Sequence, residues 1–113
     1  PMSDLDLMRG TLDVLVLKTL TGGAMHGYAV ARWIKGASEG ALLVEEGALY
    51  PALHRLERKG WIQAEWGLSD NNRKAKFYSL TTRGRQALTA ETSSWGRYVD
   101  AVAKVLASEP ALA

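Results

Sequence analysis

The residues of this chain best suited to acid–base or metal chemistry are its two histidines, His26 and His54. His54 lies one helical turn before Glu57, a spacing that places an imidazole and a carboxylate on one face of a helix. Such a pair lacks the third protein ligand of a catalytic zinc site. The sequence contains no Ser-His-Asp arrangement, no glycine-rich phosphate loop and no HExxH motif. We therefore expect no enzymatic activity, no metal site and no cofactor.

The basic side chains suggest a different chemistry because they are unevenly distributed. Residues 50–85 contain eight basic and three acidic residues, whereas residues 1–49 contain four basic and six acidic ones. In a chain with a formal net charge of only +2, such a local excess is typical of a site for a polyanion. A solvated basic face without a ligand is the alternative, and charge alone does not separate the two.

Length and composition are those of one ordinary globular domain. The chain has 113 residues, of which 47% are hydrophobic and 23% charged. It has no cysteine, which excludes disulfides and thiolate chemistry and fits a reducing compartment. No apolar run approaches the roughly 18 residues that a membrane span needs, and the N-terminal residues lack the basic region of a signal peptide. We expect a cytoplasmic protein without a membrane partner.

Periodicity predicts the elements that must position the basic residues. We expect a first helix over residues 4–21, capped by Ser3 or Asp4. Apolar residues occupy most of its circumference, whereas a surface helix is normally apolar on one side only. Leu7 and Val14 lie outside its main apolar stripe. This helix is therefore expected to pack on its own core and on a second surface, such as another subunit.

Two further helices are expected over residues 26–36 and from about residue 47 to Lys59. Proline is tolerated in the first turn of a helix, so Pro51 places the start of the second of these at residue 47 or 48. Its buried stripe consists of leucines spaced by four and three residues, namely Leu49, Leu53 and Leu56. The side chains left facing outward or sideways are Tyr50, His54, Arg55, Arg58 and Lys59.

The period then changes to two, which predicts strands. Apolar and polar residues alternate over residues 62–66 and again over 76–80. The segment between them contains Gly67 and Asn71-Asn72, which turn easily, and ends in basic residues. We expect a β-hairpin with a basic tip.

A final helix is expected from a cap at Thr81 or Thr82 to about Ala107. Its apolar positions recur at alternating spacings of four and three residues, as in a coiled coil: Leu88, Thr92, Trp95, Val99, Val102 and Leu106. The predicted fold class is mainly α with a small β-hairpin. It is a winged helix-turn-helix over residues 2–81 followed by a long C-terminal dimerisation helix over residues 82–108.

In a winged helix-turn-helix the third helix enters the major groove of double-stranded DNA and the wing reaches the neighbouring backbone. The residues expected at base edges are Tyr50, His54 and Arg55, and those expected at phosphates are Arg58, Lys59, Arg73, Lys74 and Lys76. Each of the three residues expected at base edges has an alternative: Tyr50 could pack on the helix, His54 could be solvated, and Arg55 could form an ion pair with Glu57 or another carboxylate. The whole fold could also serve as a ligand-binding or protein-interaction module without DNA binding.

Four stretches carry a resemblance to the PadR family of bacterial transcriptional regulators. They are RGTLD from Arg9, MHGY from Met25, EGALYPALHRLE from Glu46 with the following Lys59-Gly60, and KFYSLTTRG from Lys76. Together they span residues 9–84 in the family's order. The LYPALHRLE run is highly specific, and the single C-terminal helix is similar to the shorter branch of the family.

The resemblance implies a repressor that binds an inverted repeat as a two-fold homodimer, with the C-terminal helix of one subunit against the N-terminal helix of the other. The implied interface residues are Leu7, Val14, Leu88, Trp95, Val99, Val102 and Leu106. It also implies structural roles for His26 and Tyr28 at the turn into the second helix. Members often have Ser or Thr where this chain has Ala48, so this chain lacks the hydroxyl that could contact DNA there.

Because of Trp95, we expect that the protein could bind a small aromatic effector. In members that sense planar aromatic compounds, a tryptophan at the matching place lines a pore on the dimer axis, where flat rings can stack a ligand. The alternative for Trp95 is packing between subunits.

Overall fold

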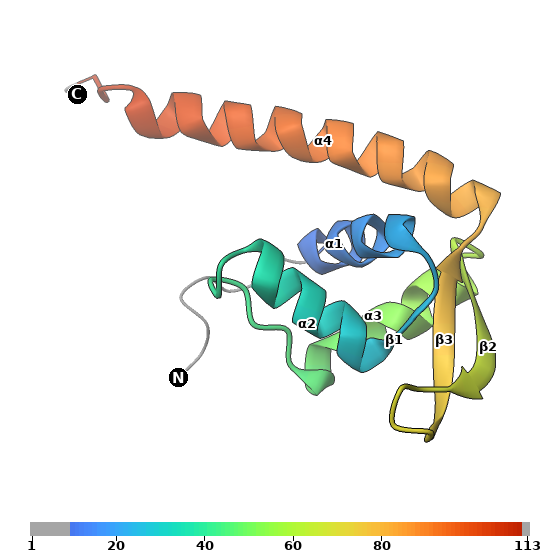
Figure 1. The fold of residues 1–113 in the computed structure, drawn as a ribbon. Coiled ribbons are helices and arrows are strands. Elements are labelled where there is room, and N and C mark those ends of the chain that lie inside the picture. Colours follow the sequence, from blue (N-terminus) through green and yellow to red (C-terminus); the bar gives the residue numbers. More distant parts are fainter. Residues whose placement is uncertain (1–9, 112–113) are drawn as a thin grey trace.

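The computed structural model describes residues 10–111 as a body of short elements with one long helix across it (Figure 1). The elements are α1 (Thr11–Thr19), the 3-10 helix η1 (Leu20–Gly22), β1 (Met25–His26), α2 (Gly27–Ala37), α3 (Glu46–Arg58), β2 (Ile62–Leu68), β3 (Lys74–Leu80) and α4 (Thr82–Ala107). This is the predicted winged helix-turn-helix followed by a C-terminal helix. No helix in the described part is long and apolar enough to cross a membrane.

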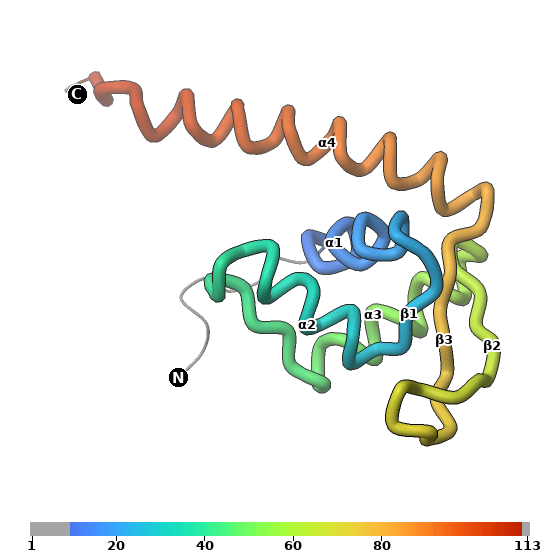
Figure 2. The backbone as a smooth tube through the Cα atoms, in the orientation of Figure 1, coloured from blue at the N-terminus to red at the C-terminus, as the bar shows by residue number. Residues whose placement is uncertain are grey.

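Helix α1 is the central layer. It contacts α4 on one side and α2 and α3 on the other (Figure 2). The hairpin of β2 and β3 flanks α3, and α4 runs on past α1 along the opposite side of the body (Figure 1). The long helix and the third helix are therefore on opposite sides of α1.

The predicted first helix is interrupted at Gly10. Gly10 adopts a left-handed conformation with φ of 91°, which interrupts the helical backbone, and α1 begins at Thr11. The prediction of a continuous helix from residue 4 was wrong because it relied on apolar spacing across this glycine. The predicted caps Ser3 and Asp4, and Leu7, lie outside the described residues.

The first turns of the second and third helices are stabilised by different hydrogen bonds. The backbone N–H of Ala29 donates to Nδ1 of His26 at 3.2 Å, so His26 is the N-cap of α2, as its predicted structural role requires. Helix α3 begins at Glu46, earlier than predicted from Pro51. The carbonyl of Glu45 accepts bonds from the amides of Ala48 and Leu49, so the first turn of α3 is complete before Pro51, which lies inside the helix.

The predicted leucine stripe of α3 is fully buried. It meets the inner faces of α1, α2 and the sheet in one core, formed by Leu12, Val16, Leu17, Leu20, Val30, Ile34, Leu49, Ala52, Leu53, Leu56, Ile62, Tyr78 and Leu80.

The sheet has three antiparallel strands in the order β1-β3-β2, one more than predicted. Met25 pairs with Tyr78 and His26 with Phe77, so the start of α2 is fixed to the hairpin. The hairpin strands also run further toward the tip than predicted, and the turn is closed by a bond from the amide of Ser69 to the carbonyl of Arg73 at 2.8 Å.

The cap of α4 is Thr81 rather than Thr82. The hydroxyl of Thr81 accepts from the amide of Gly84 at 3.0 Å and donates to the carbonyl of Gly60 at 2.6 Å. Gly84 lies so close to the carbonyl oxygen of Trp61 that a Cβ there would lie only 1.9 Å from it. These contacts fix the direction in which α4 leaves the hairpin.

Candidate nucleic-acid interface

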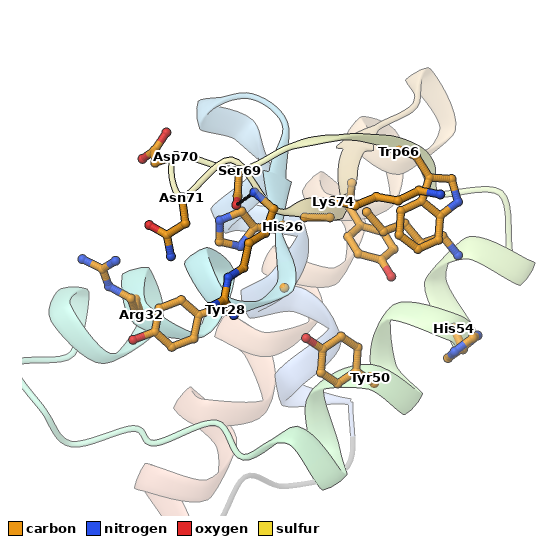
Figure 3. A pocket seen from close by; sticks show the side chains of 15 residues that line it. His26, Tyr28, Arg32, Tyr50, His54, Trp66, Ser69, Asp70, Asn71 and Lys74 are labelled. Atoms are coloured by element: carbon orange, nitrogen blue, oxygen red, sulfur yellow. Dashed lines mark hydrogen bonds between the residues drawn. The ribbon is translucent and has the colours of Figure 1, made fainter.

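A concave surface of about 700 Å³ lies between the start of α2, the outward side of α3 and the hairpin (Figure 3). Its main side chains are His26, Tyr28 and Arg32 from α2 and its cap, Tyr50 and His54 from α3, and Trp66, Asp70, Asn71, Arg73, Lys74, Lys76 and Tyr78 from the hairpin. The lining contains four cationic side chains and one carboxylate, Asp70. It is therefore an electropositive groove whose aromatic rings can lie against a sugar–phosphate backbone.

Of the predicted base-contacting residues, Tyr50 and His54 line this groove. Tyr50 is 40% exposed, and its ring lies against Gly27, where a Cβ would be 3.0 Å from the tyrosine Oη. The groove thus brings together an aromatic hydroxyl and an imidazole from α3, both able to donate to or accept from a base edge.

Arg55 has a different environment. Its Nη2 donates to Oδ1 of Asp13 at 2.8 Å, and Arg55 is not among the side chains that line the groove. This is the predicted alternative of an ion pair with Glu57 or another carboxylate, and the carboxylate is that of Asp13. Glu57 instead lies 3.6 Å from Nζ of Lys76.

Two of the hairpin's cations in the groove lie over aromatic rings. Nζ of Lys74 is 5.1 Å from the Trp66 ring centroid and Nζ of Lys76 is 5.8 Å from that of Tyr78. Cation–π contacts of this kind restrict flexible side chains while leaving the charge accessible. Arg73, at the tip of the hairpin, is exposed.

The predicted phosphate contacts Arg58 and Lys59 lie outside the groove, at the exposed end of α3. Nζ of Lys59 is 4.5 Å from the Trp61 ring. A ligand must therefore extend beyond the groove along α3 if it is to reach all of the predicted cations.

Arg32 is a groove residue that sequence reasoning missed. Its guanidinium lies 5.5 Å from the ring of Tyr28, one turn earlier on α2, and Tyr28 is 65% exposed. Tyr28 therefore lines the groove and does not pack in the core. The spacing of four residues on one helix was the signal that joins this pair.

Burial raises the pKa of the Tyr78 hydroxyl above its usual value of 10.0, and the charges of Glu57 and Tyr50 add to the shift. The hydroxyl at the inner wall of the groove thus remains protonated at neutral pH and can donate a hydrogen bond.

A second, smaller cavity of about 340 Å³ lies between α1 and α4. Its lining residues are Gly10, Thr11, Val14, Glu91, Ser94, Trp95 and Tyr98. The rings of Trp95 and Tyr98 are 5.9 Å apart. The predicted effector residue Trp95 and the predicted interface residue Val14 thus face the same space.

The other predicted interface residues differ in burial. Leu88 is half-buried against this chain's own core. Trp95, Val99, Val102 and Leu106 are all exposed and fall on the predicted stripe of α4. In the described part of the chain this stripe remains an uncovered apolar face, as expected for a surface that packs on a second subunit.

Comparison with known proteins supports the same architecture. Residues 16–90 match the sequence profile of the transcriptional regulator PadR-like family. The chain is 31% identical over 87 residues to the transcriptional regulator Rv3488 of Mycobacterium tuberculosis, covering 76% of this chain and 77% of that protein.

Two solved structures are also similar. A PadR family transcriptional regulator from Eggerthella lenta is 32% identical, with a TM-score of 0.73 and coverage of 89% of this chain and 86% of that chain. A PadR-like transcriptional regulator from Bacillus cereus is 26% identical, with a TM-score of 0.74 and coverage of 91% and 98%.

Proposed function

This chain belongs to the PadR-like family of transcriptional regulators, and on that basis we propose that it is a cytoplasmic repressor that binds an inverted repeat in double-stranded DNA as a homodimer. The members of this family are transcriptional regulators and not enzymes, so this chain is a regulator and not an enzyme.

The observation that carries the proposal is the electropositive groove between α3 and the hairpin. Tyr50 and His54 from α3 supply groups for base edges, while Arg73 and Lys74 supply charge for the backbone. One concave surface thus combines the two kinds of contact that sequence-specific DNA binding needs. The charge excess over residues 50–85 belongs largely to this groove and to the adjoining end of α3.

The apolar stripe of α4 supports the homodimer. Val99 and Val102 are exposed on a helix that runs past the body of the domain (Figure 1). Covering such a stripe with a second copy removes it from water and sets two copies of α3 in a two-fold arrangement. A spacing of roughly 34–36 Å between the two recognition helices would match successive turns of one face of DNA.

A nuclease-protection experiment on the region upstream of the protein's own gene tests the binding mode. The proposal expects two protected half-sites centred one helical turn apart. Protection of one half-site only would contradict the two-fold arrangement. Increased transcription of the adjacent genes after deletion of the regulator would support repression, and decreased transcription would contradict it.

The cavity beside Trp95 supports an aromatic effector as part of the proposal. A flat ligand between the indoles of two subunits could change the separation of the recognition helices and release DNA. Quenching of tryptophan fluorescence by a panel of planar aromatic compounds tests this. Quenching should disappear in Trp95→Phe, because Trp33, Trp61 and Trp66 lie outside the cavity. Quenching that persists in that variant would place the ligand elsewhere.

A further inference from the structure

The ion pair between Asp13 and Arg55 joins residues 42 positions apart in the sequence. Asp13 lies in the first turn of α1 and is only 9% exposed, whereas Arg55 lies on the side of α3. Among residues 10–111 it is the one ion pair that links α1 to α3.

The position of this pair connects the helix that contacts α4 to the recognition helix. Helix α1 contacts α4 and also contacts α3 (Figure 1). Asp13 lies between Thr11 and Val14, which line the cavity against α4. Any force on α1 from the dimerisation helix therefore reaches the recognition helix through the core and through this one polar link.

We propose that Arg55 is a positioning residue for DNA recognition and not a DNA contact: it fixes the orientation of α3 on α1 through Asp13. The inference rests on the proposed function, since it assigns a role in DNA binding to the pair. It also revises the expectation that Arg55 reads a base edge.

The energetics of the pair favour this role. The Arg55 side chain is 42% exposed, but that of Asp13 is only 13% exposed. An arginine that left Asp13 to reach DNA would leave this largely buried carboxylate without its charged partner, which costs free energy. Exposed cations such as Arg58 and Arg73 carry no such penalty. Phosphate contacts are thus better supplied by those residues, while Arg55 stays with its partner.

Fluorescence anisotropy separates the two roles in Arg55→Gln, Asp13→Asn and the double variant. The probes are a labelled duplex from the upstream region of the protein's own gene and a scrambled duplex. If the pair positions α3, each single variant weakens binding to the upstream duplex by about tenfold, the scale of one charge-assisted hydrogen bond. The double variant is then no weaker than either single one, since both remove the same link.

The salt dependence of binding supplies the matched control. Loss of a positioning residue leaves the slope of log K against log salt unchanged, whereas loss of a phosphate contact lowers it by about one. Arg58→Gln, one turn further along α3, removes an exposed cation and is expected to lower the slope. A lowered slope in Arg55→Gln, with unaltered binding by Asp13→Asn, would overturn the proposal. If Asp13→Asn does not fold, the slope of Arg55→Gln decides alone.

Amide hydrogen exchange provides a readout that needs no DNA. Both single variants should speed exchange along α3 by about tenfold relative to the wild type, while the amides of β2 and β3 are unaffected. Unchanged exchange along α3 would also overturn the positioning role. If the wild type fails to prefer the upstream duplex, the proposed function fails, and the exchange rates still show whether the pair fixes α3.

Discussion

Gly27 and Tyr50 lie in direct contact across the start of α2 and the side of α3. A Cβ on Gly27 would be 3.0 Å from Oη and 3.1 Å from Cε1 of the tyrosine. The missing side chain at Gly27 thus provides the space in which the Tyr50 ring lies. The position of a proposed DNA-reading side chain depends on a residue in a neighbouring helix.

Replacing Gly27 with alanine is expected to displace the Tyr50 ring and weaken binding to the upstream duplex by about fivefold, the equivalent of about 1 kcal/mol for an off-rotamer side chain. Anisotropy titration measures this change. Gly36→Ala is the control, because a Cβ at this position of the same helix meets nothing within 4 Å. It should raise the free energy of unfolding by about 0.5–1 kcal/mol without changing DNA affinity. Equal affinities of the two variants would mean that Tyr50 does not contact DNA.

The charges of the hairpin tip should act on all DNA sequences alike. The double variant Arg73→Ala and Lys74→Ala is expected to weaken binding to upstream and scrambled duplexes together and to lower the salt slope by about two. Lys35→Ala, an exposed cation outside the groove, serves as the control and should leave the slope as it is. An unchanged slope in the double variant would remove both residues from the contact surface.

The dimer interface can be tested by charging the stripe of α4. Replacing Val99 and Val102 with aspartate should yield monomers in light scattering. Each subunit would then bury two carboxylates at the interface, opposite the same carboxylates of the second subunit. Ala101→Asp adds one such carboxylate on a different face of the helix and should leave the dimer intact. Survival of the dimer in the double variant would show that the interface lies elsewhere.

The junction between the hairpin and α4 depends on Thr81. Thr81→Ala removes the cap of Gly84 and the bond to Gly60, and should lower the free energy of unfolding by about 1–2 kcal/mol. Thr82→Ala changes an exposed neighbour without such bonds and is expected to alter it by less than about 0.5 kcal/mol. Urea unfolding at equal protein concentration compares them, since dimerisation contributes to stability. Similar losses in both variants would argue against Thr81 as the cap.

Long elements with a regular apolar period were predictable from the sequence. The leucines of α3 and the apolar stripe of α4 fixed which residues face inward or remain uncovered, because side chains at those spacings share one face of a helix. The end of α4 at Ala107 followed from local signals of the same kind, whereas a structural role for His26 was implied only by the family resemblance.

Features that depend on distant residues were not predictable in this way. Strand β1 has two residues, too few to show a period, and forms only because β3 is there to pair with it. The partner of Arg55 is far away in sequence, so the sequence could name only Glu57 or an unspecified other carboxylate, and the fold supplied Asp13. Arg32 joins the groove only because the hairpin folds over the start of α2.

The most direct test of the DNA-binding role is an anisotropy titration of the wild type with the upstream duplex at two salt concentrations, with the scrambled duplex as control. We predict tighter binding to the upstream duplex and a steep loss of affinity for both as salt rises, because phosphate contacts release counterions. Absence of binding to either duplex at low salt would contradict the account. It would then favour a role for the cavity at Trp95 without DNA.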